Sequence, residues 1–136
     1  METKFNFKSA ICTSRSQSER LLSLGLKKET ADCHWAYHSV TATRYVVAHP
    51  CDGVGECIPA WSLHRMLSLL PRSICTGRNY YDIVIVQNEF VRLADDLGDT
   101  YKYFDKENLY EGLIDCIEWL IKEGYFNKEY LNGSND

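Results

Sequence analysis

An amphipathic pattern in residues 106–123, ending at Gly124, constrains this sequence more than any other feature. At 3.6 residues per turn, its apolar side chains fall on one broad arc of a helix and its charged side chains fall opposite. The apolar set comprises Leu109, Tyr110, Leu113, Ile114, Cys116, Ile117, Leu120 and Ile121. Because so wide a stripe must be buried, the pattern predicts a long C-terminal helix that organises the core. Asp105 is placed to cap it.

Two shorter helices are expected earlier in the chain. Ser16 and Glu19 fit a capping box ahead of a short helix in residues 20–24, and Gly25 suits the left-handed position that closes it. A second helix is predicted in residues 62–70, where apolar side chains recur at helical spacing before Pro71.

Strand-forming residues fill much of the remaining sequence. Residues 32–47 are rich in β-branched and aromatic side chains and predict one or two strands. Residues 81–86, 89–93 and 100–104 predict three more, with turn residues between them. We therefore expect a single α+β domain spanning residues 1–136. Its mainly antiparallel sheet would have three to five strands, packed by the long C-terminal helix and two short helices.

Composition excludes several classes of protein. No apolar run reaches the length of a membrane span, and no basic cluster exceeds Lys27-Lys28, so neither a membrane protein nor a nucleic-acid binder is expected. Residues 1–80 carry a net charge of +4 and residues 81–136 carry −8. With no signal-peptide pattern, the expected location is the cytoplasm, where the 6 cysteines would be thiols rather than disulfides.

A segment rich in cysteine and histidine, residues 33–57, is the best candidate for chemistry. Zinc prefers four nitrogen or sulfur ligands, often supplied as two close pairs. His34 and His38 are one candidate pair, and Cys51 and Cys57 are the other. On a strand, however, the two histidines would lie about 13 Å apart, too far to share one ion. A zinc site would therefore require this stretch to bend or to be helical.

Three other chemical patterns were weighed. Cys57 precedes the second helix and could act as a nucleophile with His49 or His64 as base. Residues 52–55 resemble a phosphate loop but lack its lysine and hydroxyl residues, so a turn is the better interpretation. The carboxylates of Asp95, Asp96 and Asp99 lack calcium-loop spacing, which favours a solvated hairpin turn.

Trp119 stands out because it falls outside the apolar arc of the predicted C-terminal helix. Gly112, Asp115 and Glu118 surround it on that helix, and together these four residues form a candidate interaction surface. The alternative is that the chain itself covers Trp119, through Phe5 and Phe7 or through the segment Tyr125-Phe126.

Three stretches carry a resemblance to known sequences: residues 18–26 with 30–32, residues 58–63 continuing to 69–71, and residues 117–125. Together they resemble a group of small uncharacterised proteins carried by prophages and mobile elements of gut bacteria. The resemblance covers about a third of the chain, and its motifs are structural. It implies an accessory protein of a phage or mobile element in the bacterial cytoplasm, with no activity or catalytic residues to carry over.

Two classes of function follow from these observations. The favoured class is a non-enzymatic accessory or interaction module that binds a protein partner or a second copy of itself, with no cofactor. The alternative is a zinc-supported or thiol-dependent enzyme built on the segment from Cys33 to Cys57.

Overall fold

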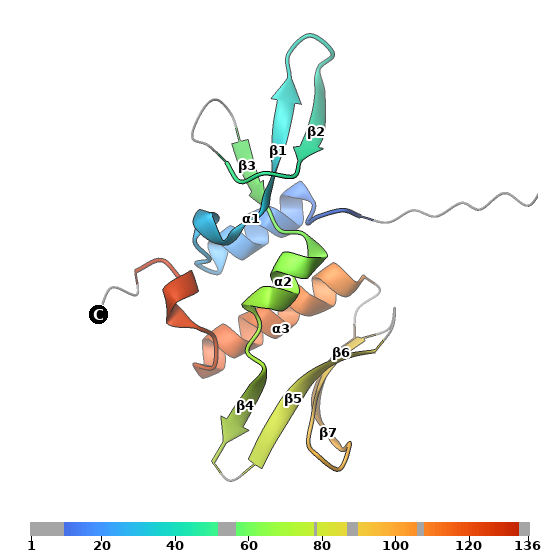
Figure 1. Ribbon diagram of the computed structural model, residues 1–136, viewed down its shortest axis with the longest axis vertical. Helices are drawn as coiled ribbons and strands as arrows, with labels where there is room; N and C mark the ends of the chain where they lie inside the picture. The colour runs from blue at the N-terminus through green and yellow to red at the C-terminus, as the bar shows by residue number, and fades with distance from the viewer. Residues whose placement is uncertain (1–9, 52–56, 78, 87–89, 106–107, 134–136) are drawn as a thin grey trace, which may run out of the picture.

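The computed structural model of the chain describes residues 10–51, 57–77, 79–86, 90–105 and 108–133. Within these ranges, three α-helices lie between two antiparallel sheets (Figure 1). The helices are α1 (Arg15–Ser23), α2 (Leu63–Leu69) and α3 (Leu109–Glu123). A short 3-10 turn follows α1, η1 (Lys28–Thr30), and another follows α3, η2 (Lys128–Tyr130). The predicted α+β class, with its long C-terminal helix and two short helices, is confirmed.

The strands divide between two sheets rather than forming one. The first sheet contains β1 (Cys33–His38), β2 (Thr43–Val47) and β3 (Cys57–Ala60), in the order β2-β1-β3. The second contains β4 (Ser73–Thr76), β5 (Asn79–Val86), β6 (Phe90–Ala94) and β7 (Thr100–Asp105), in sequence order. Figure 1 shows the β1–β2 hairpin projecting away from the helices, on the side opposite the second sheet.

Two of these strands, β3 and β4, were missed by the sequence pattern. β3 contains Pro59, which lacks a backbone N–H and usually argues against a strand, but β3 lies at a sheet edge where proline is tolerated. β4 has only 4 residues, too few for an alternating pattern to be recognised. Both strands are therefore fixed by their neighbours rather than by local preference.

Helix α3 begins later than predicted. Asp105 is the last residue of β7, opposite Phe90 of β6, so it does not cap the helix. The side chain of Asn108 does so instead, accepting a hydrogen bond of 2.7 Å from the N–H of Tyr110. The predicted C-terminal end is confirmed, because Gly124 has a φ of 81°, the left-handed conformation that glycine adopts without strain.

Helix α1 is also capped earlier than predicted. Ser14 and Gln17 form the capping box, not Ser16 and Glu19. Both pairs have the correct spacing, so the choice depends on tertiary structure. The N–H of Thr13 donates to the carbonyl of Trp61 at 2.9 Å, and this contact fixes the chain just before Ser14.

The main core lies between α3 and the four-stranded sheet. Leu113, Ile117 and Leu120 of α3 are fully buried, as are Val91 and Leu93 of β6. A much smaller cluster of Cys12, Cys33 and Ala60 supports the three-stranded sheet. No helix in the described ranges is long and apolar enough to cross a membrane.

Candidate functional site

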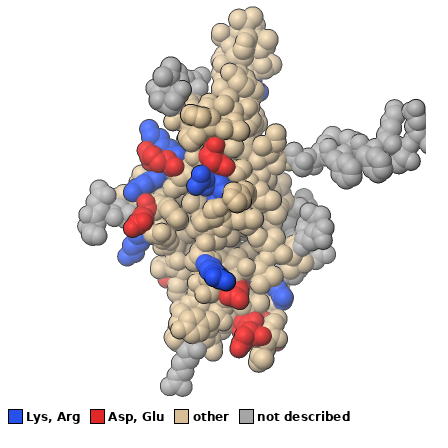
Figure 2. Space-filling model, viewed as in Figure 1, with Lys and Arg blue, Asp and Glu red and all other residues tan. Residues whose placement is uncertain are grey.

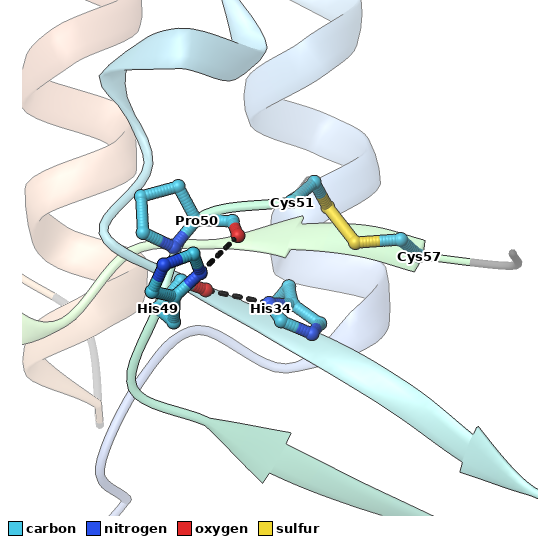
Figure 3. The surroundings of a disulfide bond; sticks show 5 residues. All are labelled: His34, His49, Pro50, Cys51 and Cys57. Atoms are coloured by element: carbon cyan, nitrogen blue, oxygen red, sulfur yellow. Dashed lines mark hydrogen bonds between the residues drawn. A yellow bond between two sulfur atoms is a disulfide. The ribbon is translucent and has the colours of Figure 1, made fainter. Parts of the chain in front are cut away.

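Three of the four side chains predicted to bind zinc gather at one end of the three-stranded sheet (Figure 3). His34 is in β1, Cys51 follows β2, and Cys57 begins β3. Cys51 and Cys57 are joined by a disulfide bond. One donor atom from each of these three residues lies within 4.8 Å of the other two. Three of the four predicted ligands are therefore brought together.

Strand pairing explains this convergence. β1 is the central strand, and His34 lies opposite Val47 of β2 on one side and Pro59 of β3 on the other. Cys57 lies opposite Ala36. Since residues two apart on a strand share a face, Cys57 is a diagonal neighbour of His34 across the sheet. The antiparallel register, rather than nearness in sequence, places the cysteine and the histidine together.

The ring of His34 is oriented by a backbone carbonyl. Its Nδ1 lies 2.5 Å from the carbonyl oxygen of His49. A carbonyl only accepts hydrogen bonds, so Nδ1 carries the proton, and in the neutral ring Nε2 then has a lone pair. His49 is oriented in the same way, through a bond of 2.8 Å from its Nδ1 to the carbonyl of Pro50. An imidazole held through one nitrogen is the usual arrangement of a histidine metal ligand.

His38 does not belong to this group. It lies at the opposite end of β1, facing Thr43 of β2, and its side chain is exposed. Its Nδ1 accepts a hydrogen bond of 3.2 Å from the N–H of Thr41 in the hairpin turn. The predicted pairing of His38 with His34 in one zinc site is wrong, because the stretch is a strand and keeps them apart.

The cysteines differ from the prediction in one respect. Cys51 and Cys57 form a disulfide, whereas Cys12, Cys33, Cys75 and Cys116 are thiols. The sulfur of Cys57 is therefore not available as the predicted nucleophile. Burial raises the pKa of Cys12 to about 11 and that of Cys116 to about 12. Burial, reinforced by Asp32, also raises the pKa of Cys33. These three buried thiols stay protonated at neutral pH and are poor nucleophiles.

Trp119 lies beside a surface pocket of about 230 Å³. The lining residues, which define the Trp119 pocket, are Lys102, Phe104, Asp115, Glu118, Trp119 and Lys122. The indole is half-buried, with its centroid 6.2 Å from the ring of Phe104 and 5.8 Å from that of Tyr125. Tyr125 thus covers part of Trp119, as the alternative prediction of cover by the chain itself expected. The pocket remains open beside the indole. Phe5 and Phe7 lie outside the described residues.

The acidic residues near Trp119 bind an arginine from α1. Arg20 Nη2 lies 2.5 Å from a carboxylate oxygen of Asp115 and 2.6 Å from one of Glu118. Its Nη1 lies 3.4 Å from Glu111. The hydrogen bond to Glu118 and the bond to Asp115 raise the pKa of the Arg20 guanidinium, outweighing the effect of burial. This cluster joins α1 to α3 at one edge of the pocket.

Gly112 differs from the other residues of the predicted surface. It is buried, and a Cβ built on it would lie 3.4 Å from the carbonyl oxygen of Phe104 and 3.7 Å from Val91 Cγ2. The glycine therefore lets α3 approach the four-stranded sheet closely. A residue buried in this way is not accessible to a partner, so the structure assigns Gly112 to packing.

Two further candidate motifs were predicted in loops. Residues 52–55 lie outside the described residues. The Asp95 carboxylate accepts bonds from the N–H groups of Leu97 and Asp99 at 3.0 and 2.8 Å, which makes it a structural element of the β6–β7 turn. Among the described residues, His34, Cys51 and Cys57 form the one cluster of such side chains close enough to hold a metal ion.

Sequence reasoning missed a larger hollow of about 420 Å³. It lies between the segment before α1, the start of α3 and the three-stranded sheet, and it is lined by Ala10, Ile11, Cys12, Ser14, Gln17, Trp35, Val46 and Asn108. Its residues come from four separate segments, so no local pattern indicates it. Its titratable group, Cys12, has a raised pKa, and the Trp35 indole N–H is already bonded to the carbonyl of Thr13 at 2.9 Å.

A scan against protein-family models, a search of curated proteins and a search of solved structures each gave no match for this chain. The His34/Cys51/Cys57 cluster and the Trp119 pocket are therefore the two features from which a function can be inferred.

Proposed function

We propose that this chain is a non-enzymatic interaction module that binds a protein partner at the Trp119 pocket. The observation that carries this proposal is that Trp119, Asp115 and Glu118, which stand out in the sequence, line one surface hollow together with Phe104. Tryptophan beside a polar rim is typical of the residues that dominate binding energy at protein interfaces.

The size of the pocket favours a protein partner over a small molecule. Ligand and cofactor sites usually enclose about 300–1,000 Å³. The Trp119 pocket, at about 230 Å³, is smaller and suits a single inserted side chain.

The charge of the pocket favours a basic side chain on the partner. Lys102 Nζ lies 5.5 Å from the ring centre of Phe104 and 5.8 Å from that of Trp119, so these rings already accept a cation. Asp115 and Glu118 add two carboxylates to the lining of the pocket, and both already bind the guanidinium of Arg20. A partner's arginine or lysine would replace Lys102 on the rings.

The surface charge does not favour nucleic acid. Figure 2 shows basic and acidic side chains interspersed over the middle and lower parts of the visible face, without a continuous basic patch among the described residues there. Proteins that bind nucleic acid usually concentrate lysine and arginine on one face. The net charge of −4 also disfavours binding to the negatively charged backbone of a nucleic acid.

The source and location of the chain are part of the proposal. An accessory role in a phage or mobile element, in the bacterial cytoplasm, is what the sequence resemblance implies. The Cys51–Cys57 disulfide is an observation against that location, because cytosolic proteins generally keep their cysteines reduced. Alkylation of thiols in intact cells tests the location. Modification of all 6 cysteines would indicate a reducing compartment, whereas modification of the 4 free cysteines alone would indicate an oxidising one.

A metal-supported enzyme is the second candidate function. After reduction of their disulfide, Cys51 and Cys57 would bind zinc together with His34 and leave one position of the tetrahedral ion open, as catalytic zinc sites do. The thiol-dependent version has less support, because Cys57 is bonded and the buried thiols have raised pKa values.

Peptide selection tests the favoured function. Random peptides displayed on phage are selected on the wild-type chain and then compared on Trp119→Ala and on Tyr80→Ala, which removes a ring that is 69% exposed on β5. We expect selected peptides to contain arginine or lysine, to lose binding to Trp119→Ala, to keep it on Tyr80→Ala, and to weaken when citrulline replaces arginine. Peptides that bind Trp119→Ala equally well would contradict the proposal. Sedimentation that changes in Trp119→Ala without peptide would identify a second copy as the occupant.

A further inference from the structure

We propose that reduction of the Cys51–Cys57 disulfide converts this end of the three-stranded sheet into a Zn²⁺ site, with Cys51, Cys57 and His34 as ligands. The inference is independent of the Trp119 pocket, which lies on α3 and β7 and shares no residue with this cluster.

The donor atoms are already close enough. Zinc binds sulfur at about 2.3 Å and imidazole nitrogen at about 2.0–2.1 Å, so ligand atoms of a tetrahedral site stand roughly 3.3–3.8 Å apart. One ring nitrogen of His34 and the sulfur atoms of Cys51 and Cys57 lie within 4.8 Å of one another. Once the sulfur atoms are no longer bonded to each other, side-chain rotations suffice to bring all three to one ion. The strand backbone that carries His34 and Cys57 need not move.

The histidine is also held in the form that a metal needs. Its Nδ1 donates to the carbonyl of His49 at 2.5 Å, which leaves the Nε2 lone pair as the donor to a metal. Outer hydrogen bonds of this kind fix the tautomer and orient the ring of a metal-binding histidine. Figure 3 shows the His34 ring beside the disulfide, with the carbonyl of His49 on its other side.

The conversion takes two steps, reduction of the disulfide and binding of the metal ion. Two thiol groups of a cellular dithiol reduce the disulfide, and the dithiol becomes a disulfide in turn, while Cys51 and Cys57 each gain a hydrogen. Zn²⁺ then displaces one proton from each cysteine and binds two thiolates and a neutral imidazole. Water takes the fourth position. Two thiolates with an imidazole suit zinc, whereas calcium and magnesium prefer oxygen ligands.

A disulfide or a zinc ion at this site would stabilise the three-stranded sheet more than it would stabilise the rest of the chain. Among the described residues, the buried apolar cluster that supports the three-stranded sheet consists of Cys12, Cys33 and Ala60, with Trp35 and Val46 packed on them. The disulfide joins the segment that follows β2 to the start of β3. A zinc ion on the same two sulfurs and His34 would join all three strands. The sheet therefore has two alternative links, a covalent one under oxidising conditions and a metal one under reducing conditions.

Metal titration of the full chain tests the proposal. The protein is reduced with a phosphine, which adds no competing thiol, and titrated without oxygen with Co²⁺ and then Zn²⁺ against a chromogenic chelator. We expect the reduced chain to bind one ion with a thiolate-to-cobalt charge-transfer band, and the oxidised chain to lack that band. His34→Asn should weaken zinc binding by at least the roughly 10–100-fold that loss of an outer-shell partner costs.

Matched variants separate this site from other thiols and histidines. His38→Asn changes the histidine at the far end of the same strand, and Cys75→Ser removes a thiol that is exposed. Both should leave the affinity unchanged, whereas Cys51→Ser and Cys57→Ser should abolish the charge-transfer band. The proposal is overturned if the reduced wild-type chain binds no zinc, if Cys51→Ser binds it equally tightly, or if His38→Asn weakens binding as much as His34→Asn. Because His34→Asn keeps both cysteines, it remains informative even where a cysteine variant fails to fold.

Discussion

The two sheets of this protein are stabilised by different interactions. The four-stranded sheet packs Val91 and Leu93 directly against the fully buried face of α3. The three-stranded sheet has a small apolar cluster and depends instead on the Cys51–Cys57 disulfide and on hydrogen bonds such as that from Trp35 Nε1 to the carbonyl of Thr13. Apolar burial is spread over many contacts, whereas a crosslink depends on one bond and on its redox environment. The comparison suggests that one region maintains the fold and the other can respond to conditions.

The largest expected effect on stability comes from substitutions in the buried face of α3. Leu113→Ala or Ile117→Ala should lower the free energy of unfolding by roughly 2–5 kcal/mol, because each removes fully buried methyl groups and leaves a cavity. Urea denaturation measures this loss, and both sheets should unfold together. Leu97→Ala, at a site that is 82% exposed, serves as the control and should change little.

A smaller effect is expected from the disulfide. Cys51→Ser with Cys57→Ser removes a link with a sequence separation of 6, for which loop-closure entropy gives about 2 kcal/mol. Measured with a chelator present, amide hydrogen exchange should accelerate in β1 and β2 and change little in β6. Uniform acceleration through both sheets would show that the two regions are not stabilised separately.

Sequence predicted the α3 region better than the three-stranded sheet, and the reason is physical. The periodicity of α3 and the turn glycines Gly25 and Gly124 are local, so helix positions and C-terminal ends could be inferred from neighbouring residues. The helix caps were misplaced because Ser14 and Ser16 both fit locally, and tertiary contact selected Ser14.

The candidate site was predicted only in part, for a related reason. His34, Cys51 and Cys57 were identified by residue type, but the disulfide and the exclusion of His38 depend on strand register. β3, which carries Cys57, was not predicted because of Pro59. Trp119 could be identified from its helical position, whereas Lys102 and Phe104 of its pocket come from β7 and required the packing of α3 on that strand.

A pH-dependent effect is expected where the two regions meet, at Asp32. Burial raises the pKa of its carboxyl, but hydrogen bonds from the Ser62 hydroxyl at 2.5 Å and the Ser62 N–H at 2.9 Å outweigh this and lower it overall. The stabilisation is therefore fully present above the ordinary Asp pKa of about 3.9 and is lost as pH falls through the depressed value. Asp32→Asn should cost about 1–2 kcal/mol at pH 7, because hydrogen bonds to a charged group contribute about 1.5–3 kcal/mol and Asp32 is only partly buried.

Denaturation across pH 2–7 checks the sign of this effect. The difference in the free energy of unfolding between wild type and Asp32→Asn should shrink as pH falls. Asp96→Asn, which changes an exposed carboxylate, should show no such trend. A difference that grows toward low pH would contradict the assignment of the stabilisation to the ionised carboxylate of Asp32.

The smallest effect on stability, and the most informative for function, is expected at Trp119. Its ring is half-buried and contacts Tyr101, Phe104 and Tyr125, and such aromatic pairs contribute about 0.5–1.5 kcal/mol each beyond area burial. Because the neighbouring rings can repack beside an open pocket, Trp119→Ala should cost about 1 kcal/mol of stability and leave unfolding cooperative. Binding of a basic peptide should fall by about 2 kcal/mol or more, as for an interface anchor. If Trp119→Ala instead destabilises the protein as strongly as Leu113→Ala, then Trp119 belongs to the same core as α3, and the pocket beside it is a packing defect rather than a binding surface.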